Sequence, residues 1–256
     1  MWILALMLIA AKPGPVPKEL QRLSEDLQAI DFKVTKTDPN TLLASHWISN
    51  TKLPMPDRIY RVVLKQAATE LFLEHWLYAG PDAAAAAKAK IDETVSSATL
   101  QDGAGIVVVS AAAESPAVKA VSEYLKCTKR PPAPSVAPKL KDYRIKERTL
   151  DRITEMATLA SGERFAVSRG GCDHTGTSYR FFVEVKKQEA VQKARALLTK
   201  LAPSTGAPKI VEALAAALDN APLDTDVKPS PNASVRVTYD DRGAEPTLTV
   251  EHFEGQ

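Results

Sequence analysis

Cysteine, net charge and long apolar runs are all scarce in this sequence of 256 residues. The two cysteines are too few for a cysteine-rich metal site, and they do not form a Cys-x-x-Cys redox pair. The formal net charge is +2, with 33 Lys and Arg interspersed among 31 Asp and Glu, so the chain lacks the basic stripe of a nucleic-acid-binding protein. With 45% hydrophobic and 25% charged residues, the composition is that of a soluble globular protein.

The longest apolar run is at the N-terminus, from Trp2 to Ala11, and it ends at the sequence Lys-Pro-Gly-Pro. A membrane span needs about 20 apolar residues, roughly twice this length, so the run suits the apolar region of a signal peptide. We therefore predict a signal peptide at 1–11, a mature chain without a transmembrane segment, and a periplasmic or secreted location. The alternative is that the run forms a buried strand or helix of the folded protein.

Export would place the two cysteines, Cys127 and Cys172, in an oxidising compartment. An isolated pair in an oxidising compartment predicts one disulfide, which would stabilise the fold by about 4 kcal/mol on the chain-entropy model. The alternative is two buried free thiols in a cytosolic protein.

Hydrophobic periodicity predicts an α+β fold of antiparallel hairpins packed by Ala-rich helices. Helical spacing predicts helices over 17–30, about 80–97, 115–126, 150–160, 188–201 and 208–218. Apolar runs and alternation predict a hairpin within 32–48, two strands within 58–78, and further strands at 105–110, 164–168, 178–185, 234–239 and 247–253. Both halves run from a helix through two antiparallel strands to an Ala-rich helix. This order suggests two related hairpin–helix units, although their sequence identity is too low to establish a duplication.

Four prolines, Pro131, Pro132, Pro134 and Pro138, fall within eight residues and predict a stiff extended connector. We therefore expect an N-terminal α+β unit at 12–126, a Pro-rich linker at 127–140 and a C-terminal α+β unit at 141–256.

Reactive side chains and glycines concentrate in one loop, 169–176. Asp173 and His174 are candidates for acid/base catalysis, and Arg169, Gly170 and Gly171 are candidates for binding an anion. The alternative is a glycine-rich hairpin connection tethered by a disulfide at position 172, in which polar residues serve the turn. No nucleophile motif or metal accompanies the pair, which favours this alternative.

Two histidines, His46 and His75, each precede a tryptophan, and with Glu74 they are the best candidates for metal ligands. Their spacing matches no local metal-binding pattern, so we predict no metal site and no cofactor. A G-x-S-x-G elbow and a phosphate-binding loop are also absent from the sequence.

These observations favour a non-enzymatic exported protein that binds another protein or a cell-envelope component through a sheet surface or a hairpin loop. One alternative is an exported hydrolase that uses Asp173 and His174. Another is a carrier that holds a small ligand between its two halves.

Overall fold

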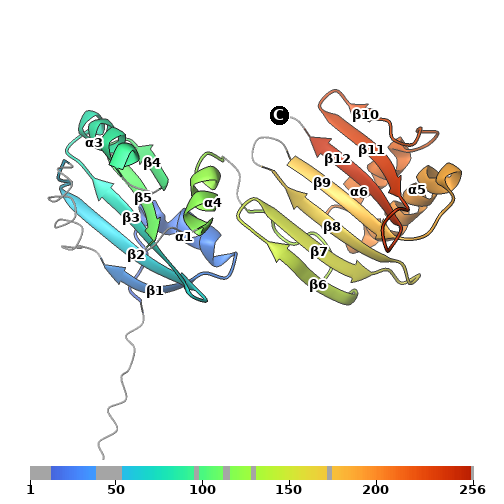
Figure 1. Ribbon diagram of the computed structural model, residues 1–256, viewed down its shortest axis with the longest axis horizontal. Coiled ribbons are helices and arrows are strands. Elements are labelled where there is room, and N and C mark those ends of the chain that lie inside the picture. Colours follow the sequence, from blue (N-terminus) through green and yellow to red (C-terminus); the bar gives the residue numbers. More distant parts are fainter. Residues whose placement is uncertain are drawn as a thin grey trace, which may run out of the picture. The chain divides into compact units, whose positions relative to one another are not determined.

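The computed structural model describes residues 13–38, 54–94, 98–111, 116–127, 131–171 and 175–254 (Figure 1). The chain divides into two units, Met1–Lys126 (unit 1) and Cys127–Gln256 (unit 2). Each unit has its own antiparallel sheet and its own helices, which confirms the mixed α+β class. The predicted signal peptide and the loop of the first predicted hairpin lie outside the described residues.

The sheet of unit 1 has five strands in the order β1-β2-β3-β5-β4, and every neighbouring pair is antiparallel. The strands are β1 (Lys33–Asp38), β2 (Arg58–Gln66), β3 (Thr69–Leu77), β4 (Ala98–Asp102) and β5 (Gly105–Ala111). Strands β2 and β3 form a two-residue hairpin in which Ala67 has a φ of 49°. The short apolar run predicted as a buried strand is β5, which lies between β3 and β4.

Helices cover both faces of this sheet: α1 (Lys18–Gln28), α3 (Pro81–Thr94) and α4 (Pro116–Tyr124). Helix α3 buries Ala84, Ala87 and Ile91 in one cluster with Trp76 and Ile106. The side chains of β3 that point to the other face of the sheet are also buried, on the side where α1 and α4 lie. These two helices lie beside each other, and the Tyr124 hydroxyl of α4 donates a hydrogen bond to Asp26 of α1.

The sheet of unit 2 has seven strands in the order β10-β11-β12-β9-β8-β7-β6, again all antiparallel. The strands are β6 (Lys141–Arg148), β7 (Arg152–Thr158), β8 (Arg164–Gly170), β9 (Thr175–Phe182), β10 (Val227–Ser230), β11 (Ala233–Asp240) and β12 (Thr247–Glu254).

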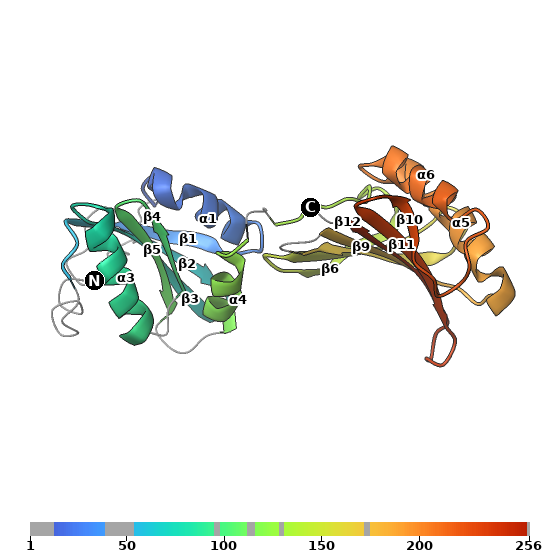
Figure 2. The same ribbon diagram turned by 90° about the horizontal axis from the view of Figure 1, so that it is seen from above.

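One face of this sheet carries helices α5 (Ala190–Leu201) and α6 (Pro208–Ala217), with short 3₁₀ turns at Lys187–Glu189 and Ala202–Ser204 (Figure 2). The helices bury alternate residues of the strands, among them Phe165, Val167, Phe181, Val237 and Val250, to form the core of unit 2. We call this side the core face. The other side carries no helix among those that the structure describes, and we call it the open face.

The predicted helix over 150–160 is wrong, because this segment contains strand β7. Apolar residues spaced by three and four suggested a helix, but the burial alternates with the period of a strand. Glu155 caused the error: it is fully buried on the core face, where an apolar residue would have made the alternation visible.

The proline-rich segment 131–140 packs against unit 2. Val136 is buried and forms an isolated β-bridge with Thr205. The Glu155 carboxylate accepts hydrogen bonds from the backbone N–H groups of Ser135 (2.7 Å) and Val136 (3.1 Å) and from the hydroxyls of Ser135 (2.9 Å) and Tyr143 (3.1 Å). This buried carboxylate fastens the segment to β7.

Across the described segments, no helix has both the length and the apolarity that a membrane crossing requires.

Candidate binding sites on the seven-stranded sheet

Hydroxyl groups form a row across the middle of the open face. Residues paired across neighbouring strands point to the same face, and the register pairs Thr154 with Ser168 and Ser168 with Ser178. The hydroxyls of Thr154 and Ser168 lie 3.0 Å apart, within hydrogen-bonding distance. Glu147 is paired with Thr154 at one end of the row, and Glu251 is paired with Ser178 at the other. We call Thr154, Ser168 and Ser178 the hydroxyl row.

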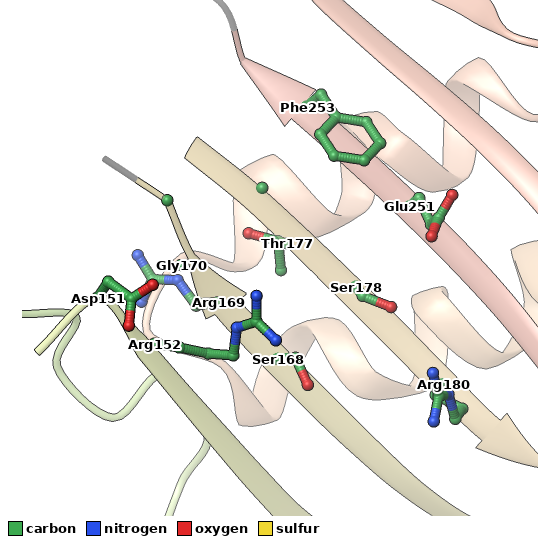
Figure 3. Close-up of a pocket in the computed structure, with 12 residues that line it drawn as sticks. Asp151, Arg152, Ser168, Arg169, Gly170, Thr177, Ser178, Arg180, Glu251 and Phe253 are labelled. Carbon is green, nitrogen blue, oxygen red and sulfur yellow. The ribbon is translucent and has the colours of Figure 1, made fainter. Parts of the chain in front are cut away.

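Two glycines lie next to this row, beside a cavity. The register aligns Arg152, Gly170, Gly176 and Phe253 on β7, β8, β9 and β12. A Cβ at Gly170 would lie 2.5 Å from the carbonyl oxygen of Asp151, so the neighbouring backbone leaves no room for a side chain there. A cavity of about 530 Å³ lies between Arg152 on one side and Glu251 and Phe253 on the other, and we call it the open-face cavity (Figure 3).

The open face carries four arginines without an acidic partner: Arg144, Arg152, Arg180 and Arg236. None of their guanidinium groups forms an ion pair with a carboxylate of the described residues, and the Nε atom of Arg236 has no hydrogen-bond partner there. Arg164, on the same face, differs because it pairs with Glu245. The open face therefore carries four arginines outside ion pairs, together with the carboxylates of Glu147 and Glu251, the second of which lies opposite Arg236 in the register.

A second cavity, of about 330 Å³, lies on the core face at the same end of the sheet, and we call it the core-face cavity. The register aligns Arg169, Thr177 and His252 along its floor, and Tyr179 follows on β9. The segment around Ser135 and the start of α6 also line it. Burial raises the pKa of Tyr179 to about 12, so its hydroxyl keeps its proton at neutral pH.

His252 is 7% exposed, and burial lowers its pKa, because desolvation disfavours the charged imidazolium. The Glu254 carboxylate, 3.7 Å from Nε2, acts in the opposite direction and is the weaker influence. We therefore expect His252 to be neutral at pH 7.

The structure places only part of the site expected from the sequence. Arg169, Gly170 and Gly171 all line the open-face cavity, and Arg169 also lines the core-face cavity. Asp173 and His174 lie outside the described residues, so the acid/base hypothesis stays untested. Cys172 lies outside them as well, and the disulfide with Cys127 stays a prediction.

The structure describes two of the three candidate metal ligands, Glu74 and His75. Among the residues with a described position, no three His, Cys, Asp or Glu side chains are grouped to hold a metal ion. His46 lies outside this set, and Glu74 accepts a hydrogen bond from the Trp76 indole at 2.9 Å. His75 is 5% exposed and its Nδ1 atom has no hydrogen-bond partner within the described structure.

We expect His75 to make unit 1 sensitive to acid. Burial lowers its pKa in the folded state, so below about pH 6.5 the unfolded chain binds more protons and the free energy of unfolding decreases. One proton changes this free energy by at most about 1.4 kcal/mol per pH unit. Tryptophan fluorescence during urea unfolding reports unit 1 alone, because all three tryptophans lie in residues 1–126.

His75→Leu should flatten the dependence of unit 1 stability on pH between 7 and 5, whereas His252→Leu in unit 2 should leave it unchanged. An unaltered slope in the His75 variant would show that another group causes the acid sensitivity.

Sequence reasoning missed Arg152, Ser168, Ser178, Glu251 and Phe253 as site residues. Alternation predicts the strand at 178–185, but the sequence does not show which strands lie beside β9. Because a helix was predicted over 150–160, the sequence analysis did not identify Arg152 as a site residue. Its position on the open face depends on β7 being a strand.

Comparisons of the chain with models of protein families, with curated proteins and with solved structures find no match.

Proposed function

We propose that this chain is a non-enzymatic, extracytoplasmic binding protein that holds an anionic polysaccharide on the open face of unit 2. The observation that carries the proposal is the group of four arginines on one face that form no ion pair with a described carboxylate. Guanidinium groups bind carboxylate and sulfate through paired N–H donors, so this face complements a chain of repeated anionic groups.

The remaining side chains favour a polysaccharide over a nucleic acid. The hydroxyl row provides donors and acceptors that match sugar hydroxyls, and Glu251 accepts hydrogen bonds from them. Phe253 is 46% exposed, and its ring gives the apolar face of a sugar a surface to pack on.

The location beyond the cytoplasmic membrane is part of the proposal. It is supported by the apolar run at residues 2–11 and by the presence of two cysteines suited to one disulfide. Envelope and extracellular polysaccharides are found in that location.

The finer description of the fold is also a proposal, namely that each unit contains a hairpin packed by an Ala-rich helix. It is supported by the β2–β3 hairpin, which α3 follows, and by the β8–β9 hairpin, which α5 follows.

We expect the protein to bind polygalacturonate, a carboxylated polysaccharide, and to bind neutral dextran far more weakly. The double variant Arg152→Gln, Arg180→Gln should weaken binding roughly tenfold or more, since each lost charge-assisted hydrogen bond contributes about 1.5 kcal/mol or more. Affinity electrophoresis in gels containing each polymer measures this difference.

The matched control is Arg195→Gln, Arg242→Gln, which changes the net charge equally but alters two exposed arginines paired with Asp219 and Asp240. It should bind polygalacturonate like the wild type. The proposal is wrong if both double variants lose the same affinity, if dextran binds as well as polygalacturonate, or if single-stranded DNA displaces the polysaccharide at lower concentration.

A further inference from the structure

The core-face cavity is lined by a tyrosine whose hydroxyl group no described protein atom uses. Tyr179 is 6% exposed and lines the cavity. Its hydroxyl has no hydrogen-bond partner in the described part of the chain. The other described tyrosines show the contrast: the hydroxyl of Tyr143 donates to Glu155, and that of Tyr239 accepts from the Val185 N–H. A tyrosine hydroxyl both donates and accepts, so without a protein partner it is available to bind water or a ligand in the cavity.

On one side of this hydroxyl the electrostatic potential is positive. Arg169 lies close enough to lower the pKa of Tyr179 in opposition to burial, and among the described residues its guanidinium donates one long hydrogen bond, of 3.4 Å, to the carbonyl oxygen of Ala133. Helix α6 begins beside the cavity, at Pro208, with no side-chain cap and no acidic residue in its first turn. The dipole of an uncapped helix start adds to the positive potential.

The opposing charge is at the mouth of the cavity. Glu254 has a side chain 54% exposed and lies 3.7 Å from the His252 imidazole. Water screens an exposed carboxylate more than the buried groups behind it. The interior of the cavity is therefore suited to an anion, and His252 faces it in its neutral form.

The other wall of the cavity is apolar. Ile210 is 47% exposed, an unusual exposure for this side chain, and Val211 beside it is buried. Both belong to the first turns of α6, and Pro134 lies on the same cavity. An anion bound at Arg169 would thus have room for an apolar group against α6 within about 330 Å³.

We propose that the core-face cavity is a second binding site, which takes a small carboxylate with an apolar body. The carboxylate accepts hydrogen bonds from the Arg169 guanidinium, the Tyr179 hydroxyl and the Thr177 hydroxyl, while the apolar body packs on Ile210 and Val211. The cavity lies on the opposite side of the sheet from the open face and shares only Arg169 and Thr177 with the open-face cavity, so the proposal does not require polysaccharide binding.

Isothermal titration of the full chain with benzoate tests the proposal, with benzyl alcohol as the uncharged analogue. Benzoate should bind at one site, and benzyl alcohol at least about tenfold more weakly, because it cannot form the charge-assisted bonds to Arg169. Tyr179→Phe removes one oxygen and no protein hydrogen bond. It should leave the circular dichroism spectrum unchanged and weaken benzoate binding roughly fivefold to tenfold.

Arg169→Gln should weaken benzoate binding roughly tenfold or more. Arg152→Gln is the matched arginine variant, since Arg152 lines only the open-face cavity, and it should bind benzoate like the wild type. The proposal is overturned if benzoate does not bind, if benzyl alcohol binds equally well, or if Arg152→Gln loses affinity while Tyr179→Phe retains it. The last result would place the carboxylate on the open face.

Discussion

Replacing Glu155 by alanine is expected to destabilise unit 2 by about 3 to 5 kcal/mol, because each buried donor left without its acceptor costs about 1 to 3 kcal/mol and the lost side chain leaves a space. Glu155 is 0% exposed and its carboxylate accepts four hydrogen bonds, two of them from the backbone N–H groups of Ser135 and Val136. Alanine leaves those donors without an acceptor and leaves a space between β7 and the segment 131–140. Hydrogen–deuterium exchange of the full chain, analysed by peptide, measures the loss of protection in unit 2.

Two further substitutions test whether the loss of stability comes from the hydrogen bonds of Glu155. Tyr143→Phe removes only one of the four donors and should cost about 1 kcal/mol. Glu212→Ala removes a carboxylate from an exposed position on α6 and should have little effect. If Glu155→Ala exchanges no faster than Glu212→Ala, the carboxylate does not fasten the segment to the sheet.

Glu155 also shows where sequence reasoning reached its limit. Residue periodicity predicted α1, α5 and α6 because their leucines and alanines repeat on one helical face. It predicted β9 because Tyr179 and Phe181 alternate with polar residues. In β7 the same rule failed, since the residue between Ile153 and Ala157 on the buried face is charged. Its four donors come from residues that only the folded chain brings together.

The candidate sites could be predicted only in part, because residues distant in the sequence complete them. Gly170, Gly171 and Arg169 stood out because glycines and a charged residue cluster in one loop, which is a local signal. The partners of these residues come from β7 and β12, and the pairing of distant strands leaves no trace in the spacing of a single sequence. The core-face cavity was not foreseen, because it needs the start of α6 to lie over the β8–β9 end of the sheet.

In unit 1 the tightest packing constraint is at Gly105, and Gly105→Ala is expected to cost about 3 kcal/mol. A Cβ at this position would lie 2.1 Å from the Nε2 atom of His75 and about 3 Å from two carbons of its ring. Gly105 and His75 lie on the neighbouring strands β5 and β3, whose register places Gly105 opposite Leu77. His75 is buried beneath the helices, so its ring has little space into which to move. Tryptophan fluorescence during urea unfolding measures the change in unit 1.

The cause of this cost can be isolated by a double substitution. In a His75→Ala background the ring is absent, so adding Gly105→Ala should cost less than about 1 kcal/mol, which corresponds to a coupling of about 2 kcal/mol between the two positions. Gly103→Ala is the matched control, because nothing lies within 4 Å of its Cβ, and any effect there comes from its φ of 58°. Such an effect should be equal with and without His75. If the cost of Gly105→Ala is also independent of His75, then the backbone of β5 requires the glycine, and the imidazole does not.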